Sequence, residues 1–264
     1  MAAARLRRQA AGSGLFDEIV VKDDQWVKSK LPDVWRATRT DAGSRGYGFW
    51  RWKPHLLSQA LQDAREKGNG VVYLDAGCEL NLNQASVERF KAYFRLAEVR
   101  GLVAMTLKDP LSQWCKKEVL DFFHLSDFQS RDTPITQAGV LVLTPTVECL
   151  ALVEEWASCA DVNDGYLFND ELDPSAQQMQ FSSHRHDQSV FTCLMSKHGM
   201  TGIPDETWFG PAWVPNGCAF PIWAIRNRFP FSRKPGTVGA TLIGAAKQLR
   251  NCCRIPKDET ASND

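Results

Sequence analysis

The sequence predicts an α/β protein, a single-domain α/β/α sandwich around a mixed, mostly parallel central sheet. Short apolar runs that suit buried strands alternate along the chain with longer segments of helical periodicity. The clearest runs are VVYL at 71–74, GLVAMTL at 101–107 and AGVLVLTPT at 138–146. Strands that alternate with helices are typical of sheets with helical crossover connections, and such sheets bind ligands beyond the carboxyl ends of their strands.

Helices are expected before, between and after these strands. The helix that precedes strand 71–74 should begin near Pro54, which suits a first turn, and should stop at Gly68. Asn83 suits the N-cap of the next helix, and Asp187 opens the last one. The other predicted helices cover residues 3–12, 113–123 and 146–159.

The two ends of the chain are expected to differ in character. Near the start, DEIVVK at 17–22 predicts an additional strand, followed by a loop that leads to Pro54. With 264 residues the chain is long enough for one large domain, to which we assign residues 1–235. Residues 236–264 are mostly small, polar or charged, so we expect a C-terminal tail.

Charge and cysteine content restrict the class of protein. The 31 basic and 31 acidic side chains leave no global basic field, which argues against nucleic-acid binding as the main task. The eight cysteines include no C-x-x-C pair, so we expect reduced thiols of an intracellular protein rather than a zinc cluster. No run is long and apolar enough to span a membrane. These features favour the cytoplasm or the cytosolic face of a membrane; a lumenal location would require an N-terminal anchor outside this chain.

The run YLDAG places Asp75 directly after the strand at 71–74. A carboxylate at a strand end, followed by Gly77, can approach a ligand closely and hold a divalent cation or a ribose hydroxyl. Alternatively, Asp75 begins an Asx-turn into the glycine and has only a structural role. Both roles stay open on residue chemistry alone, although strand-end loops are where the sites of α/β sheets concentrate.

The segment HRHDQS, residues 184–189, combines groups that catalysis uses. His184 and His186 could bind a metal, and Asp187 could orient or deprotonate a hydroxyl, with Gln188 shaping the site. The alternative is a plain helix start, in which Asp187 caps free amides and complements the helix dipole. One aspartate satisfies that need, so the additional histidines, arginine and glutamine favour a functional site.

Aromatic and basic residues gather in YGFWRWKP, residues 47–54. The rings of Tyr47 and Trp50 are platforms for sugar faces or a base, and Arg51 and Lys53 suit phosphates. Alternatively, the segment is an aromatic plug in the core with snorkelling basic residues, which composition alone favours slightly.

A second basic segment, IRNRFPFSRK, spans residues 225–234 and includes Arg226 and Arg228. It could close over a diphosphate, or it could form a solvated basic loop. The sequence has no Gly-rich phosphate loop, no G-x-S-x-G elbow and no H-E-x-x-H motif, which excludes several enzyme classes.

Four strings, taken in order, resemble a family of GT-A-like glycosyltransferases: RGYGFWRWKP, YLDAGCELN, QAGVLVLTPT and HRHDQSVFTCL. The resemblance covers roughly residues 5–230, and HRHDQS and DAGCE are its specific parts. It implies a GT-A-like, Rossmann-like fold. It also implies an enzyme that transfers a sugar from a nucleotide-sugar, UDP- or GDP-linked, to a hydroxyl of a glycan acceptor, as in polysaccharide and glycan synthesis in bacteria, large viruses and some algae.

In GT-A enzymes an Asp-x-Asp motif after a strand holds a divalent cation, Mn²⁺ or Mg²⁺, on the donor diphosphate. By this resemblance Asp75 is the first acid, while Gly77 stands where the second acid would be. One alternative is that Glu79 takes over as the second ligand. Another is that His184 or His186 shares the metal with Asp75.

A third alternative is a metal-independent enzyme in which Arg226 or Arg228 neutralises the leaving diphosphate. Asp187 and Gln188 resemble the Asp-Gln pair found near the reacting sugar in several GT-A families. This implies that Asp187 acts as base toward the acceptor hydroxyl or positions the donor sugar. Gln137, just before the third apolar strand, could also reach the sugar.

A GT-A fold normally opens with a strand that meets the nucleotide base, whereas this chain begins with the helix after it. Residues 18–22 could serve in that strand's place. The missing strand and Gly77 also fit a rival function, a catalytically silent relative that binds sugar or nucleotide or scaffolds other transferases. A third function is a metal-dependent phosphohydrolase that uses Asp75, His184 and His186.

Overall fold

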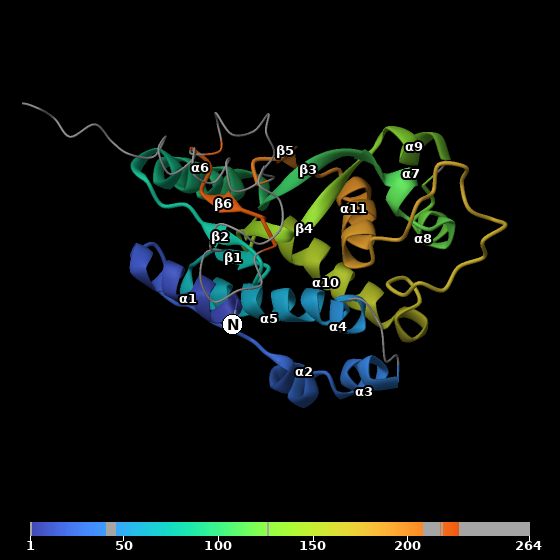
Figure 1. The fold of residues 1–264 in the computed structure, drawn as a ribbon, viewed down its shortest axis with the longest axis horizontal. Helices are drawn as coiled ribbons and strands as arrows, with labels where there is room; N and C mark the ends of the chain where they lie inside the picture. Colours follow the sequence, from blue (N-terminus) through green and yellow to red (C-terminus); the bar gives the residue numbers. More distant parts are fainter. Residues whose placement is uncertain (1, 41–45, 126, 208–216, 218, 227–264) are drawn as a thin grey trace, which may run out of the picture. The chain divides into compact units, whose positions relative to one another are not determined.

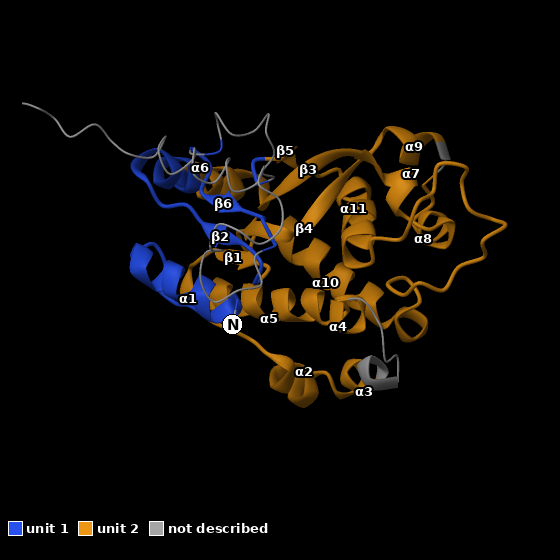
Figure 2. Cartoon of the chain, in the orientation of Figure 1, with its two compact units in different colours: residues 1–19, 76–91, 206–264 blue, residues 20–75, 92–205 orange. Residues whose placement is uncertain are grey.

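The computed structural model describes residues 2–40, 46–125, 127–207, 217 and 219–226. The chain divides into two compact units (Figure 2). Unit 1 comprises residues 1–19, 76–91 and 206–264, and unit 2 comprises residues 20–75 and 92–205. The predicted tail at 236–264 lies outside the described residues.

The elements are labelled in Figure 1. The helices are α1 (Ala2–Ser13), α2 (Asp24–Lys30), α3 (Pro32–Thr40), α4 (Gly46–Phe49), α5 (Trp52–Lys67), α6 (Gln84–Arg100), α7 (Leu111–Trp114), α8 (Lys117–Phe122), α9 (Asp127–Asp132), α10 (Val147–Asp161) and α11 (Asp187–Lys197), with a 3₁₀ turn η1 (Val162–Gly165). The strands are β1 (Val71–Leu74), β2 (Glu79–Leu80), β3 (Leu102–Pro110), β4 (Pro134–Leu143), β5 (Ile203–Pro204) and β6 (Ile222–Trp223).

Unit 2 contains a four-stranded sheet in the order β1-β4-β3-β5. The strand β4 pairs antiparallel with both β1 and β3, while β5 pairs parallel with β3. The prediction of an α/β protein with a mixed sheet is therefore confirmed. The pairing is not mostly parallel, however, because β4 runs opposite to the other three strands and is inserted between two of them. Its register sets Leu74 opposite Val140, so the end of β1 meets the middle of β4.

Helices α5, α10 and α11 pack together on one face of this sheet. Alternate residues of a strand point to opposite faces, and nearly all of β4 is buried, including the consecutive residues Val140, Leu141, Val142 and Leu143. Helix α5 packs against α10 and β1, and α11 packs against β4 and α10 (Figure 1). The buried cysteines of this core, like the other described cysteines, are free thiols.

Local signals place several elements correctly. Helix α5 ends at Gly68, whose φ of 68° is the left-handed conformation that glycine adopts at low cost. Helix α6 begins after Asn83, whose Oδ1 accepts from the amide of Ser86 at 3.0 Å. The predicted strands at 71–74, 101–107 and 138–146 are all confirmed, although β4 begins and ends a few residues earlier than expected.

Three predictions of individual helices, strands or loops were also wrong. Residues 17–22 form no strand: they lie outside both sheets, and Val20 and Val21 are 58% and 47% exposed. The expected loop after them contains α2, which Asp23 caps through its carboxylate, and α3. The expected helix at 113–123 is interrupted between α7 and α8, where Cys115 is extended and the amide of Lys116 points to His184 instead of along a helix.

Unit 1 contains α1, the antiparallel pairing of β2 with β6, and the first part of α6. The buried side chain of Arg5 donates to the carbonyls of Ala76 and Cys78, at 3.3 and 2.8 Å, so α1 is tied to the loop before β2. In neither unit does a helix of the described part of the chain have both the length and the apolar character needed to cross a bilayer.

Candidate functional site

Asp75 lies where β1 ends, as the sequence predicts. Its amide donates to the carbonyl of Gly139 on β4 at 2.9 Å, and its carboxylate leans over the same residue. A Cβ at position 139 would come within 2.7 Å of Asp75 Oδ2, so only glycine leaves room for this carboxylate. The hydroxyl of Tyr73, two residues earlier on the same strand face, donates to Oδ1 at 2.7 Å. The Asp75 side chain remains 42% exposed and can therefore meet a ligand.

Lys53, in the first turn of α5, extends its ammonium group to the carboxylate of Asp75. Its ammonium donates to Asp187 Oδ2 at 2.5 Å and to the carbonyl of Ala138 at 3.2 Å, and it lies 3.5 Å from Asp75 Oδ1. The side chain is 2% exposed, and the ring centre of Tyr73 is 5.3 Å from Nζ. Three distant segments of unit 2 thus bring a lysine and two aspartates together.

The charges of this group depend on one another. Burial opposes the charge of Lys53, but Asp187 and Asp75 outweigh it and raise the lysine pKa above 10.5. Burial raises the pKa of Asp187 to about 6, although Lys53 acts in the opposite direction. At pH 7 Lys53 and Asp187 are therefore both charged.

The chain that leads into Lys53 is strained. Five consecutive residues, 46–50, have φ between 54° and 70°, which makes a left-handed turn that contains only two glycines. The left-handed conformation costs a non-glycine residue about 1–2 kcal/mol, and such strain persists only where the surroundings impose it. Here the rings of Phe49 and Trp50 lie on the His186 ring, with centroids 5.0 and 5.7 Å apart. His186 itself has φ 50° and directly precedes Asp187.

The two histidines of HRHDQS have structural contacts. His184 is 1% exposed; its Nε2 bonds to the carbonyl of Leu167 at 2.9 Å, and its Nδ1 accepts from the amide of Lys116 at 3.4 Å. Burial, and then Lys116, lowers the His184 pKa well below 6.5, so the ring is neutral. His186 Nδ1 donates to the carbonyl of Phe168 at 2.8 Å. Both rings therefore fasten the start of α11 to the loop that follows η1.

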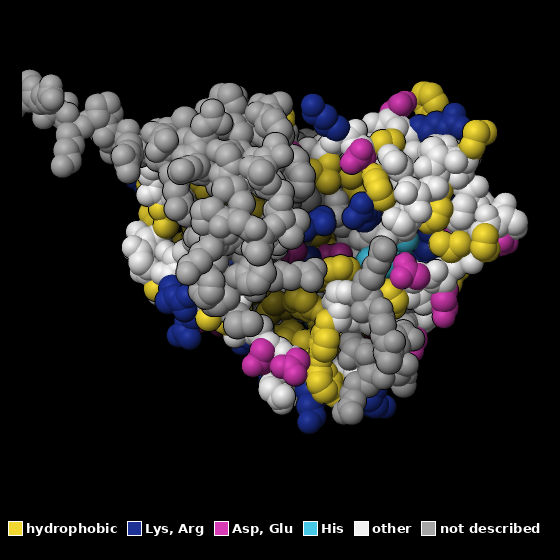
Figure 3. Space-filling view, viewed as in Figure 1, with side chains coloured by type: hydrophobic (Ala, Val, Ile, Leu, Met, Phe, Trp, Pro, Cys, Tyr) yellow, Lys and Arg dark blue, Asp and Glu magenta, His cyan; other side chains and the backbone are white. Residues whose placement is uncertain are grey.

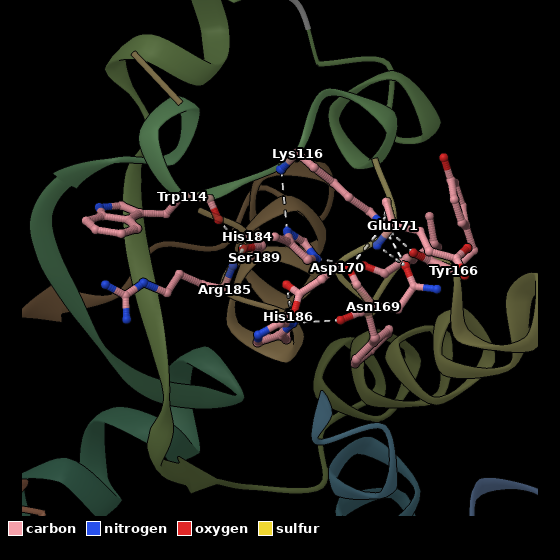
Figure 4. Close-up of polar contacts among 12 residues, drawn as sticks. Trp114, Lys116, Tyr166, Asn169, Asp170, Glu171, His184, Arg185, His186 and Ser189 are labelled. Atoms are coloured by element: carbon pink, nitrogen blue, oxygen red, sulfur yellow. Dashed lines mark hydrogen bonds and ion pairs between the residues drawn. The ribbon is translucent and has the colours of Figure 1, made fainter. Parts of the chain in front are cut away.

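A second buried lysine organises that loop (Figure 4). The Lys116 ammonium lies within 3.2 Å of four oxygens: the carbonyls of Tyr166, Asn169 and Glu171, and the Asn169 side-chain Oδ1. Burial lowers its pKa to about 8, so the ammonium form still dominates at pH 7. Lys116 thus neutralises carbonyl dipoles of the 166–171 loop, a role that the sequence did not suggest.

The other predicted ligand-binding residues are placed as follows. Arg51 is buried; it donates to the carbonyl of Ala160 at 3.0 Å and pairs with Asp164 at 3.3 Å, so it holds the end of α10. Gln137 donates to Asp205 at 3.1 Å. Arg226 is exposed in unit 1, and Gly77 is half-buried there. Tyr47 is partly exposed and lies 5.7 Å from Trp35, centroid to centroid, and Arg228 lies outside the described residues.

Two of the four predicted metal ligands are poorly placed to hold a divalent cation with Asp75. Glu79 lies in unit 1, with Oε1 4.0 Å from Arg5 Nε, and His184 has hydrogen bonds on both ring nitrogens, which leaves it no lone pair for a metal. Asp187, which was predicted as a catalytic residue and not as a metal ligand, is paired with Lys53. Within the described parts of the two units, no three His, Cys, Asp or Glu side chains are grouped as a metal site would require.

Some residues of this site were missed by the sequence analysis. Tyr73 could have been found, because it lies two residues before Asp75 and so on the same strand face. Gly139 had a weaker signal: an isolated glycine in an apolar strand often marks close approach of another group. The Lys53–Asp187 contact spans 134 residues and had no local signal.

The site can bind hydroxyl groups. Asp75 offers a partly exposed carboxylate at a strand end, and Lys53, which is paired with Asp187, lies beside it. In the space-filling view, basic, acidic and histidine side chains are visible together in a hollowed area near the middle of the face shown (Figure 3). No protein-family model, curated protein or solved structure matches the chain.

Proposed function

We propose that this protein is a nucleotide-sugar-dependent glycosyltransferase that moves a sugar from a UDP- or GDP-sugar to a hydroxyl of a glycan acceptor. The observation that carries the proposal is the convergence of Asp75, Lys53 and Asp187 at the carboxyl end of β1. Ligands of α/β sheets bind at such strand ends, and a buried Lys53–Asp187 pair beside the partly exposed Asp75 is more than the fold alone requires.

The chemistry assigns a different task to each carboxylate. In transfer, the acceptor oxygen bonds to the anomeric carbon, the nucleoside diphosphate leaves, and the acceptor proton passes to a base. Asp75, which is 42% exposed, is the group that sugar hydroxyls can reach. Asp187 was expected either to be the base or to position the donor sugar. Its side chain is 7% exposed and bonded to Lys53, which supports a positioning role beside Asp75.

A ligand panel tests the proposal. The full chain is heated with UDP-, GDP-, CMP- and dTDP-sugars, and transfer and donor hydrolysis are then measured with any sugar that raises the melting temperature. We expect one nucleotide class to stabilise the wild type and Asp75→Asn to lose that shift. The control is Asp121→Asn, an exposed aspartate of α8 that pairs with Lys117. Equal shifts and equal turnover in Asp75→Asn and wild type would refute the proposal.

The second candidate is a sugar- or nucleotide-binding protein that performs no transfer. The burial of Asp187 behind Lys53 favours it, because the aspartate expected to take the acceptor proton is not accessible to an acceptor. Isothermal titration calorimetry with a donor, followed by assay of slow donor hydrolysis, separates the two: binding without any hydrolysis or transfer identifies the silent binder. The phosphohydrolase receives less support, because the ring nitrogens of His184 are both engaged.

A further inference from the structure

The Lys53 ammonium fills the space between two carboxylates of unit 2. Its Nζ is 2.5 Å from Asp187 Oδ2, 3.5 Å from Asp75 Oδ1 and 3.2 Å from the carbonyl oxygen of Ala138. An ammonium has three protons to donate, so these three oxygens match its donor capacity. Because the side chain is 2% exposed, water does not compete for these contacts.

A divalent cation that bridged the two aspartates would need the same space. Mg²⁺ takes carboxylate oxygens at about 2.0–2.1 Å, so a bridging ion would lie against the ammonium. Two cations repel strongly where no water screens them, and moving Lys53 away would leave its own charge buried without a partner. The hydroxyl of Tyr73 already donates to Asp75 Oδ1 as well.

Of the two aspartates, Asp75 is the one that is accessible to a ligand. Asp187 is closed off in the core at the start of α11 and makes its contact with Lys53 inside the protein. Asp75 has Gly139 beneath it and solvent beside it, so part of its carboxylate can accept hydrogen bonds from outside. Direct hydrogen bonds from hydroxyl groups suit such a partly exposed carboxylate.

We propose that Lys53 is the resident cation of this site, and that the protein binds the hydroxyl groups of a saccharide directly through Asp75 without a divalent metal. The saccharide as ligand rests on the glycosyltransferase function proposed above. Lys53 is a positioning residue: it keeps Asp75 oriented, and it excludes from the site the metal that Asp75 and Asp187 could otherwise share.

Titration with Mn²⁺, followed by electron paramagnetic resonance, tests the metal part on the folded full chain. We expect wild type and Asp75→Asn to bind Mn²⁺ equally weakly, because no metal site depends on Asp75. Wild-type binding that is at least about tenfold tighter than that of Asp75→Asn would overturn the proposal. This comparison does not depend on any change at Lys53.

Removal of the lysine should create the site that it now excludes. In Lys53→Ala the two carboxylates face an open space, so we expect Mn²⁺ to bind at least about tenfold more tightly than to wild type and to raise the melting temperature. The gain should vanish in Lys53→Ala/Asp75→Asn. The control is Lys117→Ala, whose aspartate partner is exposed, and which should gain nothing. A merely structural role for Lys53 would give no such gain.

Donor binding separates this inference from the proposed function. The melting-temperature shift caused by the stabilising nucleotide-sugar is measured in EDTA and in Mn²⁺. Equal shifts support the inference, and a shift that needs Mn²⁺ and Asp75 overturns it while leaving the transferase proposal intact. If no nucleotide-sugar binds but the Mn²⁺ titrations behave as expected, the transferase proposal fails and the metal exclusion by Lys53 stands.

Discussion

Replacement of Lys53 by methionine removes the positive charge and keeps most of the side-chain volume. At a separation of 2.5 Å, the attraction between Lys53 and Asp187 is about 7 kcal/mol for an effective dielectric constant of about 20. The burial of both ions opposes most of that gain. What the substitution reveals is the cost of leaving Asp187 buried without a partner, about 3–5 kcal/mol at pH 7.

The cost should depend on pH. Burial raises the pKa of Asp187 to about 6 even with Lys53 present, and without the lysine it should rise further. Suppose that a carboxyl group stays protonated in the folded state up to pH 7 but ionises near pH 4 in the unfolded chain. The free energy of unfolding then falls by about 1.4 kcal/mol for each pH unit between these values. Between pH 5 and pH 7 the free energy of unfolding should therefore fall by about 1.4 kcal/mol in the wild type, whose Asp187 ionises near pH 6, and by about twice as much in the variant. The variant should therefore be about 1.4 kcal/mol less impaired at pH 5 than at pH 7.

Urea unfolding at both pH values measures these differences. Lys117→Met is a matched control, because Lys117 also lies 2.5 Å from its aspartate, but the two side chains are 36% and 60% exposed. Its change should stay within about 0.5 kcal/mol. The double variant Lys53→Met/Asp187→Asn should recover most of the lost stability. A loss below about 1 kcal/mol in Lys53→Met, or one that is equal at pH 5 and pH 7, would refute the reasoning.

Three further outcomes are expected. Because the folded state holds a proton on Asp187 up to about pH 6 and the unfolded chain releases it near pH 4, the free energy of unfolding should fall by up to about 3 kcal/mol from pH 4 to 7 relative to Asp187→Asn, as urea titrations at each pH will show. Gly139→Ala should displace the Asp75 carboxylate and weaken ligand-induced stabilisation, whereas Gly12→Ala, an open position within α1, should leave binding unchanged; equal ligand shifts in both would contradict the geometry. Lys116→Met should lower the free energy of unfolding by about 3 kcal/mol and increase proteolysis of the 166–171 loop; an intact loop would show that the four oxygens need no cation.

Local sequence signals determined most of the elements of this protein. Apolar runs and helical spacing place β1, β3, β4, α5, α6 and α10, because burial of one face dictates a pattern within each segment. Asn83 and Gly68 act at helix ends through contacts a few residues away, so they too can be identified from the sequence. The position of Asp75 at a strand end follows from the same patterns.

Contacts between distant segments decided the rest. Residues 17–22 have a strand-like composition, but a strand needs a neighbouring strand, and within the described part of the chain these residues belong to neither sheet. The insertion of β4 between β1 and β3, and the space that Gly139 leaves for Asp75, arise only when the sheet assembles. Lys53 and Asp187 stand 134 residues apart, and their composition alone suggested phosphate binding for one and base catalysis for the other. Burial brings the two charges together and makes each the partner of the other, because a buried charge requires an opposite one.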